Sequence, residues 1–180
     1  LMASKFARSV LGVDISQPLI DLAWERSKMA QSVQFTRTDA SSFTLVKKRD
    51  VALSRFGVMF FDDPPGAFAN IRANIAEGGR MVFACWRGPE HNAWAAVPAR
   101  AVMAFLPEAE APDPTAPGPF AFADDARLCG ILEGSGFNDI SIEPHAIEVS
   151  LAEGGGLKEA VDFAGQIGPG ARAMSELDEG

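Results

Sequence analysis

The run Val10–Asp14 (VLGVD) constrains the fold of this chain more than any other feature. A short apolar run that ends in a carboxylate and leads into a helix is typical of open α/β sheets, in which the acid accepts hydrogen bonds from two ribose hydroxyls. In a complete nucleotide-binding unit, a strand and a glycine-rich turn precede such an acid by about 20 residues. Only residues 1–9 precede the run in this sequence. We therefore expect a cofactor-binding domain whose first strand and loop are missing.

Length and charge narrow the class of protein. A chain of 180 residues predicts one domain, residues 1–180, with a core of its own. The net charge of −8, without blocks of Lys or Arg, argues against nucleic acid or an anionic membrane as the main partner. No apolar stretch approaches the roughly 20 residues of a membrane span, and no signal peptide is visible. The two isolated cysteines, Cys85 and Cys129, favour reduced thiols in a cytoplasmic protein without a metal site.

Apolar runs and turn residues predict strands and helices in alternation. Strands are expected at 9–14, 33–36, 50–54, 81–86, 139–142 and 146–151. Helices are expected at 16–30, from Pro64 to Gly78-Gly79, and at 92–106 and 125–133. This order implies a parallel sheet with right-handed crossovers, and the short connection at Pro144-His145 makes the last strand antiparallel.

Residues 88–122 are expected to leave the sheet as a helical and proline-rich lid or substrate-binding excursion. The stretch 107–119 holds five of the 12 prolines of the chain, so it is too poor in hydrogen-bond donors for a regular element. Any selectivity for a substrate would come from this excursion.

Three segments together resemble a known family: VLGVDIS at Val10–Ser16, the pair Asp39-Ala40, and residues 49–87. They look like a class I S-adenosylmethionine-dependent methyltransferase, closest to the small-molecule branch of the ubiquinone/menaquinone-biosynthesis type. The resemblance implies a Rossmann-like, mostly parallel α/β sheet with helices on both faces and an antiparallel last strand. The sequence departs from the family in lacking the first strand and its Gly-x-Gly-type loop, which contacts the amino-acid end of the cofactor.

The resemblance also implies a cofactor site at the carboxyl ends of three strands, formed by Asp14, Ile15, Asp39, Ala40, Ser54, Arg55 and Phe56. Asp14 matches the acid that binds the ribose hydroxyls, and Ile15 matches the apolar residue that packs on adenine. Asp39 matches the acid that accepts the adenine amino group, with Ala40 as a backbone contact beside it. The last three residues face the methionine moiety.

Structural roles stand beside each of these assignments. Asp14 could cap the helix that follows it, Asp39 could cap residues 40–43, and Arg55 could be a surface ion-pair residue. Aromatic residues are most often core residues, although Trp86 and Trp94 could line a substrate pocket.

The predicted function is methyl transfer to a small molecule by in-line displacement, impaired by the missing loop. Such a reaction needs positioning more than a catalytic triad, and Glu90 and His91 are the candidate bases if the acceptor must lose a proton. Two alternatives remain: a truncated, non-catalytic binding module, and a fragment of a nicotinamide-dependent oxidoreductase.

The missing strand would lie at the centre of the family's sheet and leave its two neighbours with unpaired edges. We therefore expect a homodimer whose interface includes Leu1–Ala40.

Overall fold

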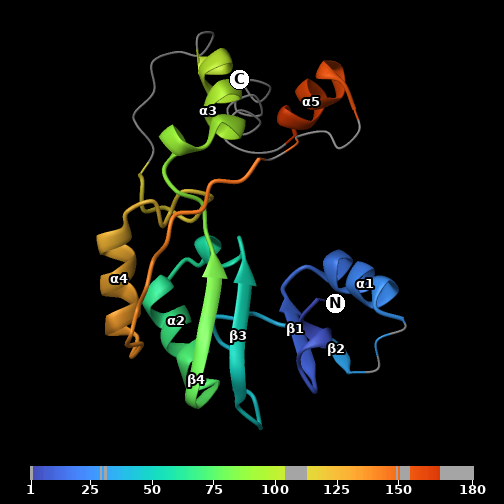
Figure 1. Ribbon diagram of the computed structural model, residues 1–180, viewed down its shortest axis with the longest axis vertical. Helices are drawn as coiled ribbons and strands as arrows, with labels where there is room; N and C mark the ends of the chain where they lie inside the picture. Colours follow the sequence, from blue (N-terminus) through green and yellow to red (C-terminus); the bar gives the residue numbers. More distant parts are fainter. Residues whose placement is uncertain are drawn as a thin grey trace. The chain divides into compact units, whose positions relative to one another are not determined.

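A computed structural model describes residues 2–28, 30, 32–103, 113–148, 150 and 155–166 (Figure 1). The chain divides into two compact units, which we describe one at a time. The first unit comprises Leu1–Ala52, Asp63–Val82 and Gly134–Gly136, and the second comprises Leu53–Asp62, Phe83–Glu133 and Phe137–Gly180. Whether they act as one domain stays a prediction.

The first unit begins with a parallel β–α–β arrangement, as the sequence predicted. Strand β1 (Val10–Asp14) and strand β2 (Val33–Arg37) pair in parallel, from Val10 opposite Val33 to Asp14 opposite Arg37. Helix α1 (Gln17–Arg26) connects them and lies against both strands (Figure 1). The α/β, Rossmann-like class is therefore confirmed. Ahead of β1 lies a single 3-10 turn, η1 (Ala3–Lys5).

Local sequence explains where α1 begins and how it packs. Ser16 is the N-cap, its Oγ accepting from the backbone N–H of Leu19 at 3.5 Å, and Pro18 occupies the first turn. Trp24 of α1 meets Phe35 of β2 edge to face, with ring centroids 5.3 Å apart. Phe35 lies so close to Gly12 that a Cβ atom at position 12 would be 2.5 Å from the ring. Glycine at this position of β1 is therefore a packing requirement.

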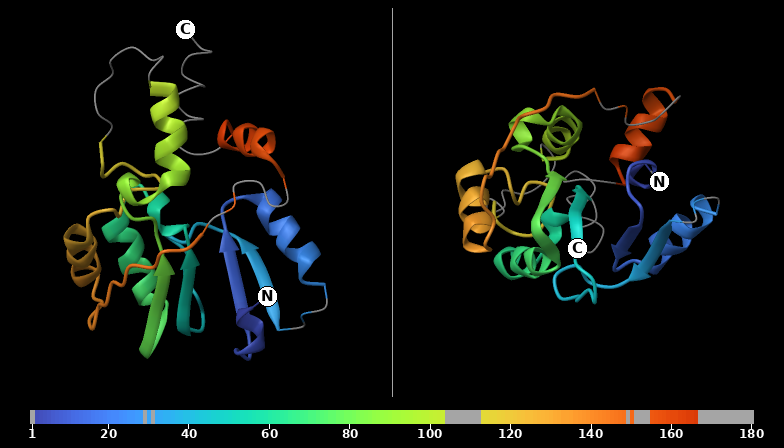
Figure 2. Two further views of the ribbon diagram at one scale, coloured as in Figure 1. Left: turned by 45° about the horizontal axis from the view of Figure 1, so that its top comes forward. Right: turned by 60° about the horizontal axis from the view of Figure 1, so that its bottom comes forward.

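Strand β3 (Arg49–Arg55) and strand β4 (Ile75–Ala84) form a second two-stranded sheet. The backbone N–H of Arg49 donates to the carbonyl of Asn74 at one end, and that of Phe56 donates to Ala84 at the other. Residue numbers rise in the same direction along both strands from the first bond to the second, so β3 and β4 run parallel (Figure 2).

Helix α2 (Pro64–Ala73) begins at the two prolines, as expected, but ends earlier than predicted. The sequence placed its end at Gly78-Gly79, whereas β4 already starts at Ile75 and runs through both glycines. Asn74 closes the helix because its backbone N–H turns back to Ile71 at 3.0 Å and its side chain bonds to neighbouring carbonyls. Gly78 has a φ of 70°, a bend inside the strand that favours glycine.

The second unit is mainly helical. It contains η2 (Val58–Phe60), η3 (Pro89–His91), α3 (Ala93–Met103), α4 (Asp125–Gly134) and α5 (Leu157–Ala164). Its buried apolar side chains, among the described residues, are Val58, Met59, Ala95, Ala121, Phe122, Leu128 and Leu132. The predicted excursion at 88–122 holds η3, α3 and a series of turns from 113 onward, and residues 104–112 lie outside the described part.

The predicted strands near the end of the chain are wrong for the residues that can be described. No strand forms at 139–148 or at residue 150, so no antiparallel last strand is seen there; residues 149 and 151 lie outside the description. Asp139 has a φ of 53°, which breaks an extended backbone where the first of these strands should begin. Side chains 141–148 are all exposed, so the alternating apolar residues have no surface to pack against.

Strand pairing within the described residues stops at these two pairs. The sheets have the orders β1-β2 and β3-β4, and none of the four strands pairs with a second neighbour. None of the helices described is long and apolar enough to cross a membrane.

Candidate functional site

Asp14 lies at the carboxyl end of β1, in the turn that leads into α1. Its Oδ1 accepts a hydrogen bond from the backbone N–H of Ser16 at 2.8 Å. From the neighbouring strand, Arg37 donates through Nε to the carbonyl of Ile15 at 3.0 Å. The backbone N–H of Thr38 donates to the carbonyl of Asp14 at 2.9 Å. The turn is thus fixed from both strands, and the carboxylate is held at the strand end.

The structure separates the two roles considered for Asp14. The N-cap of α1 is Ser16, so Asp14 orders the turn before the helix but does not cap it. Its side chain is partly exposed, and Oδ2 accepts no hydrogen bond from the described residues. Ile15 beside it is 67% exposed and unpacked. One carboxylate oxygen and one apolar side chain are therefore available to a ligand; the ribose and adenine roles stay predictions.

Asp39 follows the carboxyl end of β2, the strand paired with β1. Its Oδ1 accepts from the backbone N–H of Ser41 at 2.7 Å, and its carbonyl accepts from Phe43 at 3.0 Å. Asp39 thus holds the turn at residues 40–42, and no helix forms there for it to cap. The side-chain and backbone hydrogen bonds from Ser41 lower the pKa of this exposed carboxyl below its usual value. Asp39 thus remains an ionised acceptor at neutral pH, whatever else it binds.

Two asparagines of the α2 region hold the loop after Asp39. Asn70 donates through Nδ2 to the carbonyls of Ala40 (3.1 Å) and Phe43 (3.0 Å). Buried Asn74 donates to Phe43 at 3.0 Å and accepts at Oδ1 from the backbone N–H of Leu45 at 2.7 Å. The carbonyl of Ala40 therefore already accepts a hydrogen bond from the protein. The asparagines at α2 also hold the loop in its shape.

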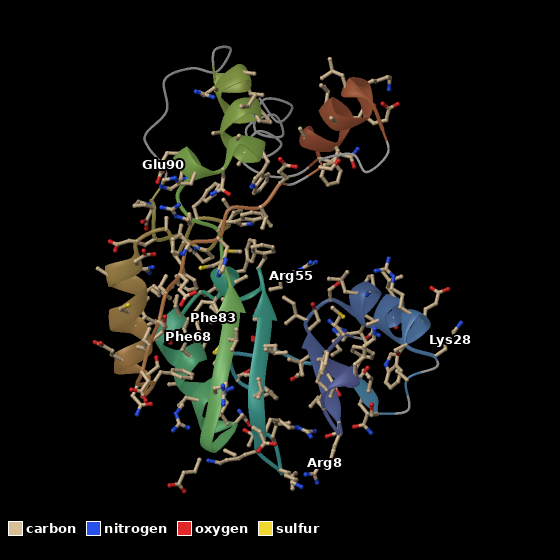
Figure 3. All side chains as sticks on the ribbon, viewed as in Figure 1. Arg8, Lys28, Arg55, Phe68, Phe83 and Glu90 are labelled. Carbon is tan, nitrogen blue, oxygen red and sulfur yellow. The ribbon has the colours of Figure 1, made fainter. Side chains whose placement is uncertain are left out.

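Ser54 and Arg55 form the carboxyl end of β3, and Phe56 follows it. Ser54 and Phe56 are partly exposed, and Arg55 is exposed at the end of the strand (Figure 3). Phe56 adopts a φ of 60°, uncommon for a bulky residue, and its ring stacks on Trp86 at 4.2 Å with an interplanar angle of 4°. The guanidinium carbon of Arg55 is 6.0 Å from the centroid of the Phe56 ring.

Four rings of the second unit follow one another and form an aromatic row: Phe56, Trp86, Trp94 and Phe120. Beyond the first stack, Trp86 and Trp94 are 5.0 Å apart, and Trp94 and Phe120 are 6.4 Å apart. The indole Nε1–H of Trp94 donates to Oδ1 of Asn92 at 3.3 Å. Asn92 is buried, and its Nδ2 donates to the carbonyls of Arg87 and Gly88. All four rings are partly exposed.

The two candidate bases lie together in η3. Nε2 of His91 is 3.4 Å from Oε1 of Glu90, and both side chains are well exposed (Figure 3). Their contact is with each other, and the described residues bring no third polar group to them. No group of three or more His, Cys, Asp or Glu side chains is arranged for a metal ion in the described part of the chain.

Little in the sequence indicated the residues that support the candidate site. Arg37, Asn70, Asn74 and Asn92 all fix backbone carbonyls of the loops around the candidate residues. The one sequence feature that indicates such residues is a polar side chain in or next to an apolar helix. Asn70 and Asn74 fit it, because they lie four residues apart in and after α2. Their partners, 27 to 31 residues away, depend on the tertiary fold.

Comparison with known proteins finds a family match and likenesses to solved structures. Residues 1–83 match the family described as "Methyltransferase domain". No curated protein matches the chain. Among solved structures, the N-methyltransferase NodS from Bradyrhizobium japonicum WM9, in complex with S-adenosyl-L-homocysteine, is 21% identical with a TM-score of 0.45. That alignment covers 49% of this chain and 48% of NodS, so the chain spans about half the length of the structure it matches.

The family match includes β1, α1, β2, β3, α2 and nearly all of β4, with both candidate acids. The first 83 residues of the chain are thus similar to a methyltransferase domain.

Proposed function

We propose that this chain binds S-adenosylmethionine and serves methyl transfer to a small-molecule acceptor. The observation that carries the proposal is Asp14 at the carboxyl end of β1, within a parallel β–α–β unit and within the stretch that matches a methyltransferase domain. In open α/β sheets, ligands bind at the carboxyl ends of the strands.

The geometry around Asp14 and Asp39 suits the adenosine part of the cofactor. Oδ2 of Asp14 would accept from the ribose hydroxyls, while Oδ1 stays on Ser16. The exposed side chain of Ile15 would pack on the adenine ring. Asp39 would accept from the adenine amino group, since its lowered pKa keeps it ionised.

The bound cofactor would supply an activated methyl group, and the protein would supply orientation. Positioning of two reactants accounts for roughly 7–11 kcal/mol of a barrier in favourable cases, so a methyltransferase can work without a catalytic triad. Glu90 and His91 would be the candidate bases for an acceptor whose hydroxyl or acidic carbon must lose a proton. Both side chains are exposed and contact each other.

Self-association through the N-terminal region, Leu1–Ala40, is also part of the proposal. Among the described strands, β1 pairs with β2 alone, and strands of parallel sheets normally have neighbours on both edges. Phe6, just before β1, is 88% exposed. A homodimer would cover both the unpaired edge of β1 and the exposed ring of Phe6.

Equilibrium binding of S-adenosylhomocysteine and NADH to the full chain tests the function. We expect saturable binding of S-adenosylhomocysteine and none of NADH at the same concentrations. Binding of NADH alone would replace the proposal with a nicotinamide-dependent enzyme, and binding of neither up to millimolar concentrations would favour a non-catalytic module.

A further inference from the structure

Arg37 is the last residue of β2 and lies opposite Asp14 in the register of the two parallel strands. The carboxyl ends of parallel strands meet at one edge of a sheet, so Arg37 lies at the edge where the proposed cofactor site is. Its side chain is exposed, yet its Nε donates to the carbonyl of Ile15, 22 residues away, at 3.0 Å. A long, exposed side chain that is tied to a distant carbonyl gives up rotamer freedom, which an arginine without a structural task would keep.

The turn after β1 is held by few contacts. Ile15 is 67% exposed, so packing of its side chain does little to fix the turn. The backbone N–H of Thr38 donates to the carbonyl of Asp14 at 2.9 Å, and that of Ser16 donates to Oδ1 of Asp14 at 2.8 Å. The bond from Arg37 ties the middle residue of the turn to the neighbouring strand. The orientation of the residues assigned to ribose and adenine therefore depends on this bond.

The charge of Arg37 has no partner among the described residues. Arg37 takes part in neither of the ion pairs found there, and Asp14 does not pair with it. The bond from Nε–H to a neutral carbonyl is thus the hydrogen bond that its side chain makes within the described part of the chain. Such a bond depends on where the donor lies and needs no positive charge.

We propose that Arg37 is a positioning residue of the cofactor site, which acts through its Nε–H donor and holds the turn that carries Asp14 and Ile15. The effect on cofactor affinity rests on the proposed function, and the effect on the turn does not. All residues involved belong to the first unit. Because the turn is held before the ligand arrives, less order has to be created on binding, and the affinity rises.

Three substitutions of Arg37 separate the donor from the charge. Glutamine has an amide nitrogen where arginine has Nε, so Arg37→Gln keeps the donor and removes the charge. Lysine has a methylene group at that place, so Arg37→Lys keeps the charge and removes the donor there. Arg37→Met keeps most of the apolar stem and has neither. Arg26→Met, at an exposed arginine of α1, is the matched control.

The first measurement is the backbone carbonyl ¹³C signal of Ile15 in the labelled full chain without ligand, since a carbonyl signal moves upfield when it loses a hydrogen bond. We expect an upfield shift in Arg37→Lys and Arg37→Met. Arg37→Gln and Arg26→Met should keep the signal near its wild-type position. Urea denaturation identifies any variant that fails to fold, and the other variants then carry the test.

The second measurement is the dissociation constant of S-adenosylhomocysteine. We expect it to rise about threefold or more in Arg37→Lys and Arg37→Met, and to stay within about twofold of the wild type in Arg37→Gln and Arg26→Met. The order of the variants is the decisive readout, because a role in packing the apolar stem alone would not distinguish lysine from glutamine.

Wild-type affinity in Arg37→Lys together with weaker binding in Arg37→Gln would overturn the inference and assign the effect to charge. An unmoved Ile15 signal in Arg37→Lys and Arg37→Met would overturn it as well. Binding of S-adenosylhomocysteine that none of the Arg37 variants weakens would overturn the inference alone. Shifted Ile15 signals without binding to any of the proteins, wild type included, would remove the proposed function and leave Arg37 a residue that holds the turn.

Discussion

At the scale of single residues, the protein engages one oxygen of the Asp14 carboxylate. Oδ1 holds the turn through Ser16, and the proposed function assigns Oδ2 to the ribose. Each charge-assisted hydrogen bond contributes about 1.5–3 kcal/mol, so Asp14→Ala should weaken S-adenosylhomocysteine binding at least about tenfold. Calorimetry at high protein concentration measures this. Glu25→Ala, an exposed acid of α1, is the matched control, and equal affinity of Asp14→Ala and the control would remove the ribose assignment.

The contribution of Asp39 to the free energy of unfolding should depend on pH. Its pKa in the folded protein lies below the unfolded value of about 3.9, so its hydrogen bonds to Ser41 stabilise the fold above that pH. This stabilisation is lost as the pH falls through the lowered pKa. Asp39→Asn should therefore unfold at lower urea concentration than the wild type at pH 7, with a smaller difference near pH 2.5. A difference of the same size at both pH values would contradict this account.

At the scale of elements, the loop after β2 depends on α2. Removing the Asn74 side chain leaves the partly buried backbone N–H of Leu45 without its acceptor, and leaves the carbonyl of Phe43 with Asn70 as its side-chain donor. Asn74→Ala should lower the free energy of unfolding by about 1–3 kcal/mol, measured by urea denaturation. Asn138→Ala, at an exposed position, should change it by no more than about 0.5 kcal/mol. Similar effects of both variants would show that Asn74 does not fix the loop.

Elements whose ends are decided locally were predictable from the sequence. Ser16 with Pro18, and Asp63 with the two prolines after it, mark the starts of α1 and α2 because caps act within one turn. The end of α2 was misplaced because Asn74 closes the helix through side-chain contacts, while Gly78-Gly79 looks like a helix stop. The strands expected beyond residue 138 failed since an alternating pattern needs a surface to cover, and side chains 141–148 have none.

In the candidate site, too, residues with a local sequence pattern were predictable and contacts that depend on the tertiary fold were not. Asp14 and Asp39 were found from the sequence because strand-terminal acids carry a local pattern. The stacking of Phe56 on Trp86 could not be foreseen, since it joins residues 30 positions apart and requires a left-handed backbone at Phe56.

At the scale of the whole molecule, the proposed homodimer can be checked by sedimentation. Sheet order among the described strands leaves β1 with one neighbour, and a second chain can supply another. We expect a dimer at micromolar concentration, and Phe6→Asp, a charge at an exposed ring in the proposed interface, should shift it toward monomer. A stable, folded wild-type monomer at that concentration would defeat the prediction.

The central claim is that the strand-end acids of the first unit bind the adenosine part of S-adenosylmethionine. An NMR titration of the ¹⁵N-labelled full chain with S-adenosylhomocysteine tests it most directly, because it locates even weak binding. The account predicts saturable shifts of the backbone amides of Ile15, Ser16 and Ser41, which adjoin the two carboxylates. Unmoved signals at these three positions up to millimolar ligand, or equal shifts with NADH, would contradict it.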